Sequence, residues 1–288
     1  MAVYLLAAFL AAPLGAAPLR ITDDSGSTLL FATSPQRIIS LAPNLTELAY
    51  AAGLGGKLVA VTAYSDYPPE AKLLPQVGDA FRLDWERLLA LKPDLVLGWQ
   101  SGLSARDRAM FGKLGIKLLV LEPHRLQDIP ETVRALGRLA ESPVQAETAA
   151  RDLEQQQQAL ARRYAQRPEV RVWLQVAAAP LLTVNGRHIL SDVLRLCGAR
   201  NVFADQPLLT AAVSVEALVA ARPQLLLALA DGPQQETAIR RDWARLAPGV
   251  PTGFLSPDLL SRAGPRLLQG AASVCRQVEQ VRSPVPIP

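Results

Sequence analysis

The sequence predicts an α/β protein of two lobes with parallel central sheets, joined by a single long helix. Three observations predict this fold class. Short apolar runs typical of strands alternate with helix-forming stretches in both halves of the chain, as expected of parallel sheets covered by helices. Residues 145–166, between the two halves, contain neither Gly nor Pro. One block of sequence also recurs, once in each half.

The N-terminal half begins with two short strands at residues 19–32, around a turn at 24–26. Asn44 or Thr46 is positioned to cap the first helix. In order, the remaining elements are a strand at 37–41, a helix at 44–52, a strand at 58–62, a helix at 84–91, a strand at 94–98, a helix at 104–114 and a strand at 117–121.

A helical linker separates the two halves. Residues 126–166 favour helix throughout except at Pro130 and Pro143, and the stretch 145–166 predicts about six turns. We expect this helix to act as a stiff spine that keeps closure between the lobes small. The expected organisation is an N-terminal lobe at 17–142, an interlobe helix at 143–167 and a C-terminal lobe at 168–288.

The C-terminal half resumes the alternation of strands and helices. The expected elements are a strand at 170–176, a helix at 188–196, a helix at 213–221, a strand at 225–229, a helix at 235–245 and a last helix at 266–281.

The recurring block predicts that the two lobes are built alike. Residues 85–97 (WERLLALKPDLVL) and 215–227 (VEALVAARPQLLL) align without a gap, and Glu86 matches Glu216. Each copy reads as a Glu, a short apolar helix, a basic residue and a Pro, then a buried strand. Because Pro cannot continue the helix, the chain turns there and enters the strand. Chance similarity between two helix–strand units is the alternative, but the matching order of flanking elements favours a true repeat.

The N-terminus predicts a signal peptide at residues 1–16. Residues 2–17 are all apolar or small except Tyr4, and residues 3–14 have the length of a signal-peptide core. No Lys or Arg follows Met1, so the usual basic segment is absent, and a buried helix is the alternative. No Cys lies near the cleavage site. We therefore expect a protein free in the periplasm and not anchored by lipid.

Composition excludes several classes of function. The net charge is +4, but the basic residues are scattered and form no stripe interleaved with aromatics, so no nucleic-acid groove is expected. The chain has no nucleophile elbow, phosphate-binding Gly-rich loop or zinc-protease motif. It has only two histidines, which leaves little general-base chemistry to assign. We expect no enzyme activity, no metal site and no cofactor.

Cys197 and Cys275 are the only cysteines. An even number of cysteines in an exported chain favours a disulfide. Two unrelated buried thiols are the alternative.

Three motifs resemble the family of solute-binding proteins for cobalamin, siderophores and haem. They are residues 37–48 (RIISLAPNLTEL), 64–69 (YSDYPP) and 91–96 (LKPDLV). The resemblance covers residues 35–282. The motif at 64–69 and the placement of the cysteines resemble the cobalamin branch of the family, whereas the motif at 91–96 is shared across it. By this resemblance, Cys197 and Cys275 match the disulfide of the family.

The resemblance implies that the protein captures cobalamin or another corrinoid in a cleft between its lobes and delivers it to an ABC-transporter permease. Cobalamin is then a transported ligand, and the free protein is a monomer. The glutamate at the head of each copy of the repeat, Glu86 and Glu216, would dock onto arginines of the permease dimer. A two-fold partner presents the same basic patch twice, which fits an acid repeated on both lobes. The alternative for each glutamate is a first-turn acid that complements its helix dipole.

The ligand-contact positions of the family map onto several residues here. Tyr64 matches a tyrosine that touches the corrin, and Trp99 matches a tryptophan of the cleft; core packing is the alternative for both. The positions matching a loop on the nucleotide side of the ligand are Asp258, Leu259, Leu260, Ser261 and Arg262, in which two leucines replace an aromatic pair. Ala80, Leu182 and Thr210 stand where the family has further aromatics, and Phe81 can substitute for the first. Loss of stacking surface at these positions lowers the expected affinity for a flat macrocycle.

Binding of haem or a ferric siderophore by the same fold is the alternative function. Haem needs an axial His or Tyr, and the candidates are Tyr64, Tyr67 and His188.

Overall fold

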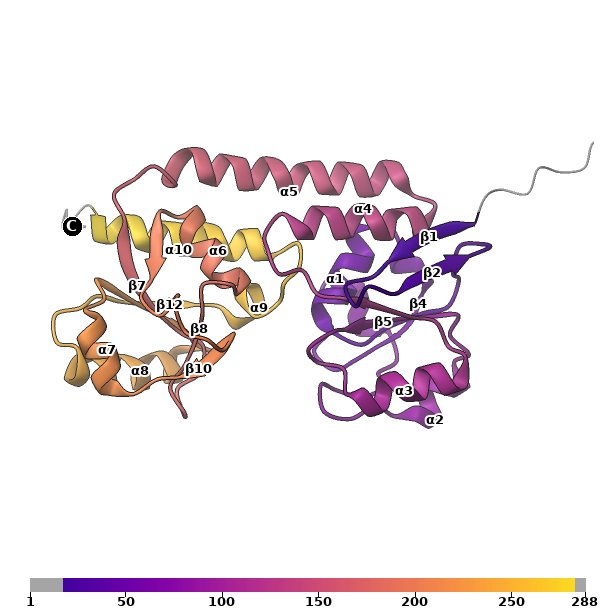
Figure 1. The fold of residues 1–288 in the computed structure, drawn as a ribbon, viewed down its shortest axis with the longest axis horizontal. Helices are drawn as coiled ribbons and strands as arrows, with labels where there is room; N and C mark the ends of the chain where they lie inside the picture. Colours follow the sequence, from indigo (N-terminus) through magenta and orange to yellow (C-terminus); the bar gives the residue numbers. More distant parts are fainter. Residues whose placement is uncertain (1–17, 283–288) are drawn as a thin grey trace, which may run out of the picture.

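The computed structural model describes residues 18–282, so the predicted signal peptide lies outside the described residues. Two lobes stand side by side, with helix α5 running along the top of both (Figure 1). This arrangement confirms the predicted fold class. None of the helices within residues 18–282 combines the length and the apolar character needed to cross a membrane.

The first lobe holds a sheet of four parallel strands in the order β4-β3-β5-β6, and an antiparallel hairpin of β1 and β2 lies beside it. Its elements are β1 (Leu19–Thr22), β2 (Thr28–Phe31), β3 (Ile38–Ser40), α1 (Pro43–Ala51), η1 (Gly55–Lys57), β4 (Leu58–Val61), η2 (Pro69–Leu73), α2 (Trp85–Ala90), β5 (Leu95–Trp99), α3 (Ala105–Leu114), β6 (Leu118–Leu121) and α4 (Asp128–Ala140).

The second lobe holds a parallel sheet in the order β12-β11-β7-β9 and an antiparallel pair, β8 and β10. Its elements, after α5 (Pro143–Tyr164), are β7 (Val170–Gln175), β8 (Leu182–Val184), α6 (Ile189–Leu196), β9 (Ala199–Asn201), β10 (Thr210–Ala212), α7 (Val215–Ala221), β11 (Leu225–Leu229), α8 (Pro233–Leu246), β12 (Thr252–Leu255), α9 (Pro257–Leu260) and α10 (Leu267–Arg282).

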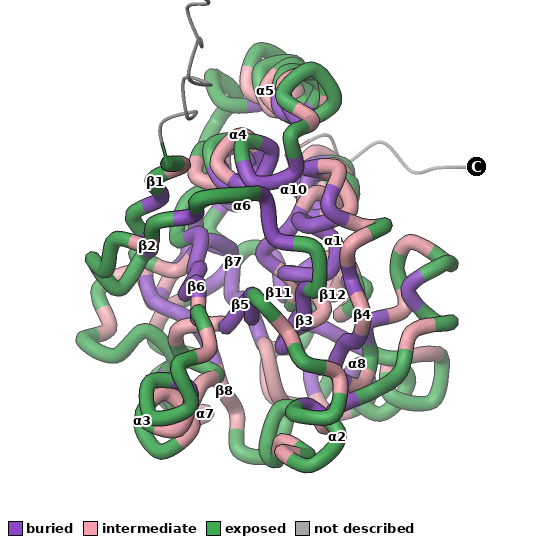
Figure 2. The backbone as a smooth tube through the Cα atoms, turned by 90° about the vertical axis from the view of Figure 1, so that its right-hand side faces the viewer, coloured by how far each residue is buried: buried purple, intermediate pink, exposed green. Residues whose placement is uncertain are grey.

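In each four-stranded sheet an inner strand, β5 or β11, is buried on both faces, which is why these strands are continuous apolar runs. In β5, Leu95 and Leu97 face one core cluster and Val96 faces another. In β11, Leu227 belongs to the first cluster and Leu226 to a third, around the tryptophans of the C-terminal lobe. Inner strands such as β5 and β7 lie in the buried centre of the molecule, and helices such as α2, α3 and α5 lie at its exposed periphery (Figure 2). The first cluster is contiguous across both lobes, so they share part of one core.

Helix α5 is the predicted spine. Its 22 residues span about 33 Å at 1.5 Å per residue. Pro143 is its first residue, where a missing N–H costs nothing. Gly137 of α4 lies so close to α5 that an added Cβ would stand 2.1 Å from the Cβ of Ala146. Arg134 of α4 forms ion pairs with Glu147 and Glu154 of α5, at 2.7 and 2.5 Å. The two helices are therefore held together along two turns.

The disulfide prediction is confirmed. Cys197 at the end of α6 is bonded to Cys275 in α10, with 4.7 Å between their Cα atoms, and both residues are fully buried. The bond ties the last helix of the chain to the C-terminal lobe, so the alternative of two unrelated thiols is wrong.

The predicted cap of the first helix is wrong. Helix α1 begins at Pro43 with Ala42 as its N-cap and no side-chain cap. Asn44 and Thr46 lie inside the first turn, and the Thr46 hydroxyl donates to the Ser40 hydroxyl at 2.9 Å or the carbonyl of Ala42 at 3.2 Å. Pro43 suits the first helical position without help because its φ is already helical.

Candidate functional site

A pocket lies between the lobes, at the carboxyl ends of strands from both sheets. Trp99 ends β5, Glu122 follows β6, Val176 follows β7 and Leu229 ends β11, and all four line the pocket. The carboxyl ends of parallel strands are where ligands bind in open α/β sheets. The pocket is partly open to solvent and has a volume of about 240 Å³. This pocket between the lobes is the candidate binding site.

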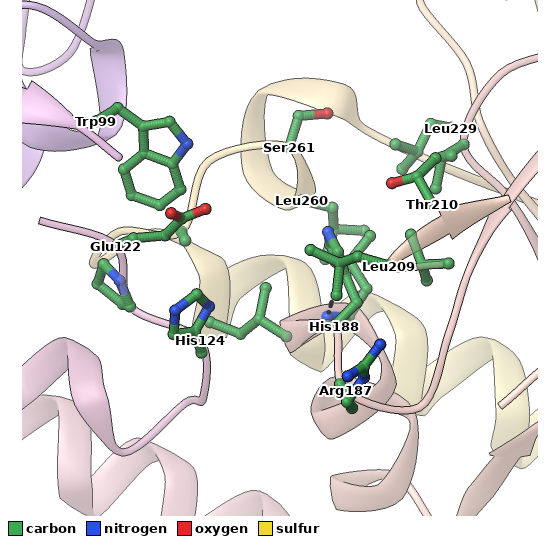
Figure 3. Close-up of a pocket in the computed structure, with 16 residues that line it drawn as sticks. Trp99, Glu122, His124, Arg187, His188, Leu209, Thr210, Leu229, Leu260 and Ser261 are labelled. Atoms are coloured by element: carbon green, nitrogen blue, oxygen red, sulfur yellow. Dashed lines mark hydrogen bonds between the residues drawn. The ribbon is translucent and has the colours of Figure 1, made fainter. Parts of the chain in front are cut away.

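The pocket is lined by both apolar and polar side chains. Trp99 is partly buried and packs against the first core cluster. Figure 3 shows Glu122 beside Trp99 on one side of the pocket, and His188, Arg187 and Thr210 on the other. An indole flanked by acceptors and donors fits a ligand with a flat apolar body and a polar edge.

Both histidines of the chain line this pocket, although they are far apart in sequence. His188 is the N-cap of α6, and the N–H of Leu190 donates to its Nδ1 at 3.1 Å. Burial, together with the nearby His124, lowers the pKa of His188 from 6.5 to about 4. His188 is therefore neutral at physiological pH. No group of three or more His, Cys, Asp or Glu side chains within residues 18–282 is arranged to hold a metal ion.

The predicted ligand loop at residues 258–262 divides between the pocket and a neighbouring ion-pair cluster. Leu260 and Ser261 line the pocket, and Leu260 is otherwise buried against Gly270 of α10. Leu259 is half-buried and packs near the same glycine. Asp258 and Arg262 pair with each other at 3.0 Å. The structure therefore places two of the five residues at the cavity.

An ion-pair cluster next to the residues of this loop joins the two lobes. From the N-terminal lobe, Glu47 of α1 pairs with Arg266 at 2.6 Å and Arg262 at 3.4 Å. Asp66 pairs with Arg262 at 2.6 Å, and this hydrogen bond lowers the pKa of Asp66. The guanidinium of Arg266 lies over the ring of Tyr67, 4.2 Å from its centroid. Arg262 is thus occupied by protein carboxylates from both lobes.

Tyr64 and Phe81 are not brought into the pocket. Tyr64 has a left-handed backbone (φ 65°) in the loop after β4, and its side chain is 78 % exposed. Phe81 is 97 % exposed and borders a separate hollow beside Trp85 and Arg106. The alternative that Tyr64 is a core residue is therefore wrong. Both side chains are free to contact a ligand only outside the pocket.

The two predicted docking glutamates occupy equivalent positions. Glu86 stands in the first turn of α2 and Glu216 in the first turn of α7, and both are exposed. Asp84 and Ser214 cap the two helices in the same way, each accepting from the N–H three residues on. The basic residues before the two Pro residues, Lys92 and Arg222, both adopt φ 47°. The repeat seen in the sequence is therefore a repeat in structure.

Sequence reasoning missed Glu122 and His124 as site residues. Both follow the strand predicted at 117–121, and a polar residue directly after a buried parallel strand is a signal that would have found them. Of the three positions expected to have lost an aromatic, Thr210 lines the pocket, whereas Ala80 does not and Leu182 lies in β8.

Residues 38–241 match the periplasmic binding protein family. The chain is 40 % identical over 247 residues to the vitamin B12-binding protein of Pectobacterium carotovorum, covering 85 % of this chain and 88 % of that one. Among solved structures, the periplasmic vitamin B12-binding protein of Vibrio cholerae superposes with a TM-score of 0.78 at 34 % identity, covering 87 % of this chain and 99 % of that one. A periplasmic haem-binding protein from Pseudomonas aeruginosa gives a TM-score of 0.75 at 29 % identity, and the match covers 85 % of this chain and 92 % of that one.

Proposed function

The chain belongs to the periplasmic binding protein family, and we propose that it captures cobalamin or a closely related corrinoid and delivers it to an ABC-transporter permease. The observation that carries this proposal is the similarity to vitamin B12-binding proteins over most of the chain, at 40 % identity for one relative. The identity to the haem-binding protein of Pseudomonas aeruginosa is 29 %. The haem alternative is therefore less supported.

The pocket between the lobes would hold only part of the proposed ligand. At about 240 Å³, the pocket is smaller than the roughly 300–1,000 Å³ of sites that hold drug-sized ligands. A corrinoid is larger still, so part of it would project towards solvent. Trp99 offers a face inside the pocket, and the exposed Tyr64 offers another outside it. In this proposal the two aromatics contact different parts of one macrocycle.

A side-by-side titration with cyanocobalamin, cobinamide and haem tests the proposed ligand. We expect binding of one cyanocobalamin per chain at micromolar concentration, detected as heat or as a change in the cobalamin absorption spectrum. Trp99→Ala should weaken this binding because a stacked aromatic contributes beyond its area. Haem binding with a Soret shift, together with no heat from either corrinoid, would support the alternative instead.

Docking to the permease is the second part of the proposal. Glu86 and Glu216 lie in equivalent first turns of α2 and α7, which suits a partner with two-fold symmetry. In proteoliposomes carrying the permease and its ATPase, the Glu86→Ala/Glu216→Ala variant should lose most of the cobalamin uptake. Its affinity for cobalamin in a titration should equal that of the parent protein. Glu131→Ala, which removes an exposed first-turn acid of α4, is the matched control and should transport normally.

Location and motion complete the proposal. An export signal at residues 1–16 would deliver the chain to the periplasm as a free monomer. The lobes at 17–142 and 168–288 would move little about the helix at 143–167, since α4 and α5 are paired by Arg134 and the lobes share a core. Small-angle scattering with and without cyanocobalamin should give nearly the same radius of gyration, and a large compaction would contradict this part.

A further inference from the structure

The carboxylate of Glu122 is an unused acceptor in the wall of the binding pocket. The residue is 9 % exposed and lines the cavity. Its backbone N–H donates to Asp24, which fixes the chain just after β6. Its side chain forms no ion pair or hydrogen bond with residues 18–282. Its carboxylate oxygens are not completely buried, so they remain accessible from the pocket. The carboxylate is therefore directed to whatever occupies the pocket.

His188 is an unused donor on the opposite wall. Because its Nδ1 accepts the N–H of Leu190, the proton of the neutral ring is on Nε2. Within the described part of the chain Nε2 has no hydrogen-bond partner, and it is not completely buried. A protonated Nε2 has no lone pair for a metal, so His188 in this tautomer donates to a ligand and does not coordinate haem iron.

The remaining polar groups of the pocket do not replace this pair. Arg187 uses one guanidinium nitrogen on the carbonyl of Pro207, at 2.7 Å, and stands on the same wall as His188. His124 is exposed at the rim, and Thr210 has a hydroxyl that either donates or accepts. Glu122 is the one carboxylate among the residues that line the cavity.

We propose that Glu122 selects a ligand whose edge carries carboxamides over one whose edge carries carboxylates, and that His188 adds affinity by donating to an acceptor oxygen of that ligand. This inference rests on the proposed function and deepens it. A primary carboxamide is both donor and acceptor, so its N–H groups suit Glu122 and its carbonyl suits His188. A carboxylate at the same place offers no donor and meets the charge of Glu122 in a poorly solvated wall. Corrinoids carry an edge of carboxamides, whereas haem carries propionates.

The test compares cyanocobalamin with its monocarboxylic acids, in each of which one carboxamide has been hydrolysed. The parent protein should bind at least one of these acids about 10- to 100-fold more weakly than cyanocobalamin, the range expected when a hydrogen bond to a charged group is replaced by a repulsion. Glu122→Gln should reduce that ratio to about threefold or less, because the amide of Gln donates to a carboxylate. Glu131→Gln removes the same charge far from the pocket and should leave the ratio unchanged.

His188→Asn separates binding from folding. Asn is a favoured N-cap, so this variant keeps the start of α6 but is too short to present a donor where Nε2 lies. It should melt like the parent and bind cyanocobalamin about tenfold more weakly. Equal amide-to-acid ratios in the parent protein and Glu122→Gln, or undiminished affinity in His188→Asn, would overturn the inference while leaving cobalamin binding intact. Failure of the parent protein to bind any corrinoid would overturn the proposed function itself, and the inference with it.

Discussion

The buried ion pair between the lobes should be among the most costly single contacts to break. The Glu47 side chain is 1 % exposed and that of Arg266 is 14 % exposed, with 2.6 Å between the carboxylate and the guanidinium. Removing one partner of such a pair leaves a buried charge without compensation, at a cost of about 3–5 kcal/mol. Arg262, 3.4 Å from the same carboxylate, remains as a second cation. We therefore expect Arg266→Met to cost about 3 kcal/mol, the lower end of that range.

Replacing both partners should cost much less than removing the arginine alone. In the Glu47→Leu/Arg266→Met variant no charge is stranded, and apolar side chains of similar volume often substitute for a buried pair without loss. Arg262 keeps Asp66 and Asp258 as partners. Urea denaturation of the four proteins in this cycle gives the coupling energy, which we expect to exceed about 1.5 kcal/mol.

An exposed pair of the same chemistry is the control. Arg245 and Asp242 are 2.6 Å apart on α8, with side chains 70 % and 49 % exposed, and Arg245→Met should cost less than about 1 kcal/mol. The reasoning fails if Arg266→Met costs no more than this control, or if the two substitutions in the cluster are simply additive.

The disulfide joins cysteines 78 residues apart in sequence, so Cys197→Ala/Cys275→Ala should lower the free energy of unfolding by up to about 4.5 kcal/mol on the chain-entropy estimate. An unchanged urea midpoint after reduction of the disulfide would argue against this. The pKa of His188 falls from 6.5 unfolded to about 4 folded, so between those values the unfolded chain binds the extra proton. Stability should be insensitive to this group above pH 6.5 and fall by about 2–3 kcal/mol as the pH drops to 4, a slope that urea titrations of His188→Asn should lack. Gly137→Ala should lower the free energy of unfolding by about 1–3 kcal/mol through overpacking, because the added Cβ would lie 2.1 Å from that of Ala146. Thermal melts measure this loss, and a melting temperature equal to the parent's would show that α4 and α5 separate freely.

The regular elements of the first lobe were predictable because their local signals agree. Apolar runs such as residues 95–99 are long enough to read as buried strands, and Ser104 and Asp84 carry the caps expected of helix starts. The strands missed in the second lobe are β8, β9 and β10, which have three residues each, and β12, which has four. Unlike the equally short β3, whose sequence belongs to a β-branched apolar run, these strands are interrupted by polar residues or Gly, so only their pairing partners define them.

The site also contains residues whose role was predictable from the sequence and residues whose role was not. Trp99 was predicted by resemblance and lines the pocket, whereas Arg262 was predicted as a ligand residue and is held by Asp66 and Glu47. Those carboxylates are about 200 residues away in sequence, with separations of 196 and 215. No local pattern connects such distant residues, so the ion-pair cluster could not be foreseen.

The sequence by itself determined the class of the fold and the two matching lobes, and it favoured the disulfide, because periodicity, the recurring block and an even cysteine count are local or countable properties. The tertiary structure decided what faces the cleft. Glu122 and His188 come from different lobes and read alone as an acid after a strand and a histidine before a helix. Glu122 follows the parallel strand β6, whereas His188 follows the antiparallel strand β8 of the other lobe, so the two side chains meet only because the lobes pack around the same pocket.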